Sequence, residues 1–161
     1  MTDKQHLDPS DYRRAAVLTK HQRNGNIAGV LAIVEETNTA DRAAELMLAT
    51  MALHGTFIRR LRTADGITLM ADWVHGMGGV DTPDAALIAR AARILECHAN
   101  NDLGGIDREM RAATAEDRAT EQFLALLDLY EVALPELTSR AALGWIDTQI
   151  EVLRLEEAWD E

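Results

Sequence analysis

The stretch DRAAELMLA at residues 41–49 returns as DRATEQFLA at residues 117–125, which is an offset of 76 positions. Between residues 14 and 61, the ungapped overlay at this offset matches 13 of 48 positions identically. An alanine-rich composition gives about four chance matches over that length, and about twice as many once the best offset is chosen. The overlay therefore predicts a structural unit of about 76 residues that occurs twice in the chain.

Helix and turn signals recur at the same offset. A carboxylate followed by proline opens a predicted first helix at residues 8–22. Turn residues at 24–26 precede a second predicted helix at residues 27–37. The corresponding turn and helix in the second copy are residues 100–102 and 103–113. A glycine in the first turn of this helix and of its copy predicts a close approach between neighbouring helices, at Gly29 and Gly105.

A third helix is expected after residue 41 and its copy after residue 117, because each follows a capping side chain that stands three residues before an acid. Apolar residues at helical spacing extend these helices to Leu61 and Leu137, with Pro135 placed to kink or end the copy. The fourth helix of each copy has an apolar face with the same spacing: Ile67, Met70, Val74 and Met77 in the first, and Leu143, Ile146, Ile150 and Leu153 in the second.

The fourth helix of the first copy is expected to stop at the glycine-rich run of residues 76–79, and Pro83 to open the next helix. The last helix is expected to continue to about Trp159. Because no alternating run of β-branched residues supports a strand, the predicted fold is all-α. The prediction is one compact multi-helix domain over residues 1–161, built from two tandem four-helix repeats at 8–83 and 84–159 with pseudo-twofold symmetry.

Composition and charge exclude several classes of protein. A chain of 161 residues with 47% hydrophobic and 27% charged residues has the size and composition of one globular domain. The net charge of -11 repels phosphate backbones, so we expect no direct nucleic-acid binding. No apolar window approaches the length of a membrane span and no secretory signal opens the chain, which predicts a cytoplasmic protein without a membrane contact. The 14 arginines against two lysines, with many alanines, are typical of a GC-rich bacterial genome.

Titratable residues do not assemble into a recognisable catalytic or metal motif. Asp72 and His75 are three residues apart but have no matching pair in the second copy, and two ligands do not make a metal site. Cys97 is the only cysteine, which excludes an intramolecular disulfide and a cysteine-rich zinc site, and the residues around it match no nucleophile motif. The run at 76–79 lacks the strand and lysine of a phosphate loop. We therefore predict no catalytic residue, no metal and no cofactor.

The favoured functional hypothesis is a non-enzymatic helical module that binds a protein partner or a second copy of itself as a homodimer. Aromatic residues and methionine are enriched at interfaces, and the repeat does not require the tryptophans of this chain. The predicted partner-binding residues are Trp73, Met77 and Trp159.

Two alternatives remain open from the sequence. The first is a small-molecule-binding or enzymatic bundle with a pocket between the repeats, lined by Met51, His54, Phe57, Phe123 and Tyr130. The second is an acidic inhibitor or nucleic-acid mimic that covers a basic surface, for which carboxylates spread from Glu116 to Glu161 supply the charge.

Overall fold

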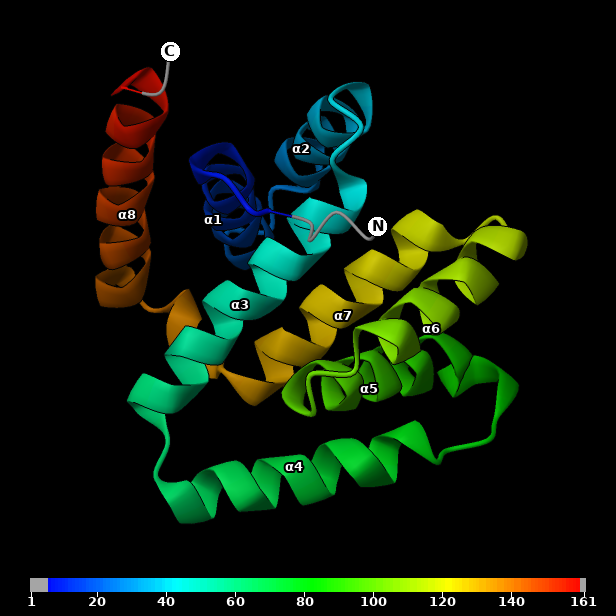
Figure 1. Cartoon of the computed structure of the whole chain (residues 1–161). Helices are drawn as coiled ribbons and strands as arrows, with labels where there is room; N and C mark the ends of the chain where they lie inside the picture. Colours follow the sequence, from blue (N-terminus) through cyan, green and yellow to red (C-terminus); the bar gives the residue numbers. More distant parts are fainter. Residues whose placement is uncertain (1–5, 160–161) are drawn as a thin grey trace. The chain divides into compact units, whose positions relative to one another are not determined.

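The computed structural model describes residues 6–159, and these residues form eight α-helices, two short 3-10 helices and no strand. The all-α prediction is confirmed. Asp160 and Glu161 of the acidic segment lie outside the described residues. In chain order (Figure 1), the helices are α1 (Pro9–Arg23), α2 (Ile27–Thr39), α3 (Ala43–Leu61), α4 (Ala64–Gly78), η1 (Pro83–Ala85), α5 (Ala86–Ala99), α6 (Leu103–Ala115), α7 (Ala119–Ala133), η2 (Pro135–Thr138) and α8 (Arg140–Trp159).

Four of the helices end in the same kind of turn. After α1, the N–H of Gly25 donates to the carbonyl of Gln22 (3.1 Å), and the N–H of Asn26 donates to the carbonyl of His21 (2.8 Å). This pair of bonds is the Schellman motif, in which the residue after the cap takes a left-handed conformation. The same pair of bonds follows α2, α5 and α6, and the left-handed residues are Gly25, Asp41, Asn101 and Asp117.

The start of α7 differs from the sequence-based expectation. The N-cap of α7 is Arg118, and it makes no side-chain cap hydrogen bond, so the predicted capping box at this helix is wrong. The reason is that Asp117, with φ of 58°, belongs to the Schellman turn that ends α6, which delays the next helix by one residue. Short polar residues such as aspartate tolerate this left-handed conformation better than most.

The chain divides into two compact units. The first unit holds residues 1–56 and 135–161, and α1 is its central helix because α1 packs against both α2 and α8. Ala15, Ala16 and Leu18 of α1 are fully buried or nearly so. Ile146 and Ile150 are the buried residues of α8, on the face that α8 presents to its own unit. The short helix η2 packs against α8.

The second unit holds residues 57–134, and α5 is its central helix. α5 packs against α4, α6 and α7, and α6 also packs against α7. The buried face of α5 is again rich in small side chains, with Ala89, Ala91, Ala92 and Ile94 as its members. The boundary between residues 56 and 57 falls within α3. The boundary between residues 134 and 135 falls just before η2.

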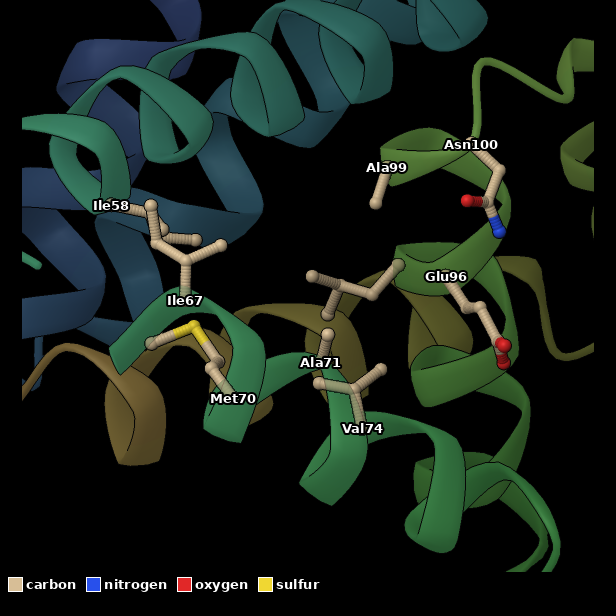
Figure 2. A pocket seen from close by; sticks show the side chains of 9 residues that line it. Ile58, Ile67, Met70, Ala71, Val74, Glu96, Ala99 and Asn100 are labelled. Atoms are coloured by element: carbon tan, nitrogen blue, oxygen red, sulfur yellow. The ribbon is translucent and has the colours of Figure 1, made fainter. Parts of the chain in front are cut away.

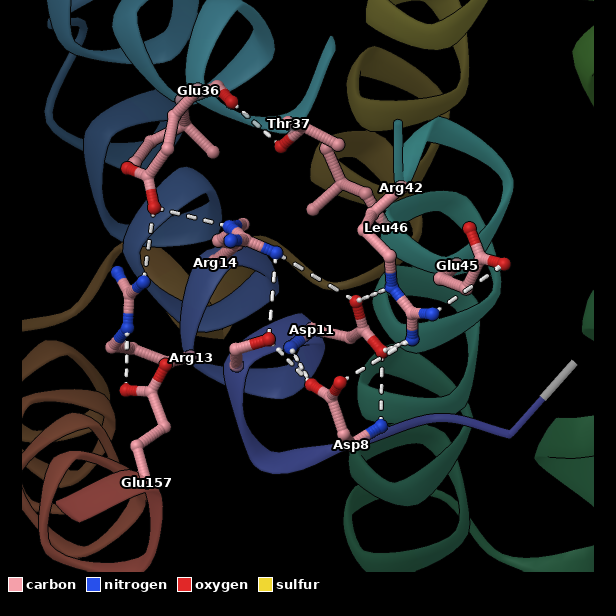
Figure 3. A network of polar contacts seen from close by, with 12 residues as sticks. Asp8, Asp11, Arg13, Arg14, Glu36, Thr37, Arg42, Glu45, Leu46 and Glu157 are labelled. Carbon is pink, nitrogen blue, oxygen red and sulfur yellow. Dashed lines mark hydrogen bonds and ion pairs between the residues drawn. The ribbon is translucent and has the colours of Figure 1, made fainter. Parts of the chain in front are cut away.

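A network of ion pairs fixes the start of α1 to the start of α3 within the first unit (Figure 3). Asp8 and Asp11 form a capping box at the N-terminus of α1, as the sequence predicts for a helix that opens at Asp8. The carboxylate of Asp11 is fully buried and receives two hydrogen bonds from the guanidinium of Arg42. Hydrogen bonds from Ser10 and Asp11, together with the positive charge of Arg42, outweigh burial and lower the pKa of Asp8.

Gly29 and Gly105 occupy equivalent close contacts in the two units. A Cβ added at Gly29 would lie 2.6 Å from the imidazole of His21 on the preceding helix, and one at Gly105 would lie 2.6 Å from Sγ of Cys97. The capping side chain is equally close, because Asp102 accepts a hydrogen bond from the N–H of Gly105. Glycine therefore makes room for both the preceding helix and the cap.

Asp11→Ala is expected to lower the free energy of unfolding by about 2–3 kcal/mol, because it removes one side of the capping box and leaves Arg42 without its buried partner. The change is measured by urea unfolding. The matched control is Asp107→Ala, which removes an exposed carboxylate paired with Arg111 and is expected to cost less than about 0.5 kcal/mol. Equal costs for the two variants would contradict the structural role of Asp11.

Gly105→Ala is expected to destabilise the protein by about 1–3 kcal/mol, because the new methyl group overlaps Cys97 and Asp102. Gly144→Ala is the control, since a Cβ at this interior position of α8 meets no atom within 4 Å. It is expected to raise stability by about 0.5–1 kcal/mol through helix propensity alone. Thermal and urea unfolding of both variants measure the difference, and stabilisation by Gly105→Ala would refute the packing argument.

Candidate functional site

α8 has apolar side chains on two opposite faces. One face carries Ile146 and Ile150, which are buried in the first unit. The other face carries exposed apolar residues at positions i, i+7, i+10 and i+14, a spacing that keeps them in line along a helix. These residues form what we call the α8 stripe, and they are Trp145, Val152, Leu155 and Trp159, with exposed fractions of 38%, 44%, 59% and 83%.

The borders of the α8 stripe are mainly acidic. Glu151 and Asp147 lie on one side and Glu156 on the other, and all three are exposed. The cation on this part of the helix, Arg154, is paired with Glu151 at 2.8 Å. On the first side, Asp147 also forms an ion pair with Lys20 of α1. The stripe is therefore an apolar surface with a net negative border.

The other predicted partner-binding residues lie on α4, in the second unit. Trp73 is 38% exposed and Met77 is half-buried. Leu69, one turn before Trp73 and on the same face, is 70% exposed. The structure thus places Trp73 and Met77 on one helix and Trp159 on another, in different units.

The predicted pocket-lining residues are all buried. Met51 and His54 belong to the first unit, and Phe57, Phe123 and Tyr130 belong to the second. Burial raises the pKa of the Tyr130 hydroxyl, and burial is also the largest influence on the pKa of His54, which it lowers to about 4. The Nδ1 atom of His54 lies 2.7 Å from the carbonyl oxygen of Thr50, so the neutral ring donates its Nδ1–H there. A pocket between the repeats stays a prediction.

A cavity of about 210 Å³ lies in the second unit, away from the predicted pocket residues (Figure 2). α4 contributes Ile67, Met70, Ala71 and Val74 to its wall, and the last turns of α3 contribute Ile58. α5 supplies the remaining lining residues, which are Leu95, Glu96, Ala99 and Asn100. Figure 2 shows the two polar side chains, Glu96 and Asn100, together on α5 across from the apolar side chains of α4.

The surroundings of Cys97, His75 and the glycine-rich run do not form a catalytic or metal site. Burial and the nearby carboxylates of Asp102 and Glu109 raise the pKa of Cys97, which opposes the thiolate that a nucleophile requires. His75 is exposed, and its Nδ1 atom lies 2.8 Å from Glu96 of α5. Among residues 6–159 there is no group of three or more His, Cys, Asp or Glu side chains placed to hold a metal ion. The glycine-rich run at 76–79 forms the end and cap of α4.

Comparisons of the chain with protein families, with curated proteins and with solved structures find no match. Within the described part of the chain, no helix is long and apolar enough to cross a membrane. What the protein does is therefore inferred from its own residues.

The sequence did not indicate the cavity. Ile67, Met70 and Val74 were expected to be one packed face of the fourth helix, yet Val74 alone of the three is buried. The sequence feature that could have indicated the cavity is the high apolar content of α4. Contact with α5 alone does not cover so many apolar side chains.

The buried imidazole of His54 makes stability depend on pH. Its folded-state pKa of about 4 lies below its ordinary value of 6.5, so the unfolded chain binds the proton more readily. Stability from this group is complete above pH 6.5 and is lost as the pH falls toward 4. Between pH 7 and pH 5, the free energy of unfolding is expected to fall by about 2 kcal/mol more in the native protein than in His54→Gln. Urea unfolding of both proteins at pH 7 and pH 5 measures this loss of stability. An equal loss in the native protein and in His54→Gln would contradict a lowered pKa of His54.

Proposed function

We propose that this protein is a non-enzymatic helical interaction module that binds a protein partner through the α8 stripe. The observation that carries the proposal is the exposure of Trp159, Leu155 and Val152 on the face of α8 opposite its buried isoleucines. Apolar residues scattered singly over a surface need no explanation, but a line of them along one helix marks an interaction site. Tryptophan is also the residue most enriched among those that dominate binding energy.

The spacing of the α8 stripe favours another helix as the partner. Val152, Leu155 and Trp159 follow the 3-4 spacing of the seam between two packed helices. Each apolar side chain that becomes buried in such a seam contributes about 1.5–3 kcal/mol relative to leaving it exposed. A partner helix with an apolar seam of its own fits this surface best.

The acidic borders of the α8 stripe favour a partner whose helix carries lysine or arginine beside its apolar face. In a parallel pair of identical α8 helices, Glu151 of one copy would face Glu156 of the other, because these positions are five residues apart. Like charges at that place disfavour the homodimer, whereas a lysine or arginine of the partner can pair with Glu156 and can take the place of Arg154 at Glu151. We expect this partner in the cytoplasm.

We also infer that the interaction module arose by duplication of a four-helix segment. The two copies are residues 8–83 and 84–159, and together they form one domain. One observation in support is that α6 (residues 103–115) begins and ends 76 residues after α2 (residues 27–39). Their caps, Asn26 and Asp102, each accept a hydrogen bond from a first-turn glycine N–H. The central helices also have corresponding neighbours. α1 packs on α8, the fourth helix of the second repeat, and α5 packs on α4, the fourth helix of the first repeat. On this proposal, each unit contains the fourth helix of the other repeat.

The test uses a designed helical peptide with leucine along one seam and lysine on both flanks. It is expected to bind with micromolar affinity, and the double variant Leu155→Ala/Trp159→Ala is expected to weaken binding at least about tenfold. Fluorescence anisotropy of the labelled peptide measures the affinity. The control variant is Leu69→Ala/Val132→Ala, which removes two exposed apolar residues elsewhere, at 70% and 68% exposure, and should leave binding unchanged.

Two outcomes would overturn the proposal. If a matched peptide with glutamate flanks binds as well as the lysine peptide, the charge argument is wrong. If light scattering shows a dimer that the Leu155→Ala/Trp159→Ala variant dissociates, the occupant of the α8 stripe is a second copy of the chain. Circular dichroism of each variant verifies that α8 remains folded.

A further inference from the structure

Polar contacts fix both ends of α4, the helix that forms one wall of the cavity. Just before α4 begins, Nη2 of Arg62 donates to the carbonyl oxygen of Ala133 (3.0 Å). Where α4 ends, Nη1 of Arg93 donates to the carbonyl oxygen of Gly78 (3.0 Å). Between these two points Val74 is the buried residue of the helix. These contacts fix both ends of α4, and the cavity lies between them on the side of α4 that faces α5.

The walls of this cavity are apolar and its volume suits a small molecule. Figure 2 shows Ile58, Ile67, Met70 and Val74 surrounding the space from α3 and α4. At about 210 Å³, the cavity exceeds the ~150 Å³ apolar cavity that accepts benzene in an engineered protein. An apolar group placed between these side chains gains dispersion contacts with them.

One end of the cavity carries negative charge. Glu96 lies in the last turn of α5, and Asn100 is the C-cap of that helix. The carbonyl groups at a helix C-terminus concentrate partial negative charge, which adds to the carboxylate and attracts a cation. The side chain already at this carboxylate is His75, whose Nδ1 atom lies 2.8 Å from Oε1 of Glu96. The lining residues themselves include no lysine or arginine.

We infer that this cavity is a binding site for a small amphiphilic amine, with its apolar body between α4 and α5 and its ammonium group at Glu96. The ammonium donates hydrogen bonds to the carboxylate of Glu96 and to the side-chain oxygen of Asn100. The combination of an apolar recess and a single acidic end selects for a compact hydrophobic group that carries one positive charge. This site is separate from the α8 stripe, because all of its residues belong to the second unit.

The experiment compares three probes of nearly equal size by isothermal titration calorimetry on the full chain. They are 2-phenylethylammonium, the neutral 2-phenylethanol and the anionic 3-phenylpropanoate. The ammonium is expected to bind with a dissociation constant below about 1 mM, the alcohol at least about tenfold more weakly, and the carboxylate not measurably. The methyl resonance of Met70 should shift on titration, whereas that of the fully buried Met51 should not.

Two variants locate the site. Glu96→Gln keeps the shape of the side chain and is expected to weaken the ammonium at least about tenfold while leaving the alcohol unchanged. Its control is Asp72→Asn, which removes an exposed carboxylate of α4 that does not line the cavity and is expected to change neither affinity by more than about twofold. Ala71→Leu fills the cavity and is expected to abolish binding of both probes in a protein that circular dichroism shows to be folded.

Three results would overturn the inference. Equal affinities for the ammonium and the alcohol would mean an apolar recess without charge selection, as expected for a partner's side chain. Unchanged ammonium binding in Glu96→Gln would place the cation elsewhere. No saturable binding of any probe up to about 10 mM would mean that the cavity takes no small ligand of this class.

Discussion

Close packing against the alanine-rich faces of α1 and α5 is the constraint on which each unit depends. Ala15 and Ala16 of α1, and Ala91 and Ala92 of α5, have almost no solvent exposure. Small side chains at a helix interface let neighbouring backbones approach and leave room for larger residues from the neighbours to interdigitate. In the first unit α1 receives α2 and α8 in this way, and in the second α5 receives α4, α6 and α7. The α8 stripe and the α4 wall of the cavity both lie on helices that such a central helix contacts along one face.

The ends of the helices could be predicted from the sequence because they depend on residues three to five positions apart. Asp8, Asn26 and Asp102 cap helices where expected, and the turn at Asn24-Gly25-Asn26 is a Schellman motif. The start of α7 was predicted wrongly because Thr114, the expected capping residue, lies inside α6, and Asp117, the expected acid of the capping box, can also serve as the left-handed residue of the preceding turn. Local sequence does not decide between these two roles, and the hydrogen bonds that end α6 do.

Burial could not be predicted in the same way. Ile146 and Trp145 are adjacent apolar residues of one helix, yet the first is buried and the second is exposed. Helical periodicity identifies apolar faces but does not tell which of two faces a neighbouring helix covers. The same ambiguity hid the cavity, because Ile67 and Met70 share a face with Val74, yet only Val74 is buried and the other two line the cavity. Tertiary contacts distant in sequence decide these cases.

Ion pairs between helices join charged side chains within each unit. Arg13 bridges Glu36 and Glu157, and Arg90 pairs with Glu116 within the second unit. Hydrogen bonds from Arg13 and Arg14, together with their positive charges, outweigh burial and lower the pKa of Glu36. Beside the α8 stripe, Asp147 and Glu151 are likewise engaged in ion pairs, with Lys20 and Arg154.

The order in which the ribosome releases the helices has a consequence for biosynthesis. The second unit is one continuous segment, residues 57–134, and all of its helices are available as soon as α7 has emerged. The first unit needs α8, so α1 must wait for the last helix of the chain before its alanine face is covered on that side. At about 5–20 residues per second, that delay lasts several seconds. During it, the side of α1 that α8 covers lacks that neighbour, and we therefore expect residues 57–134 to complete their packing before the first unit does.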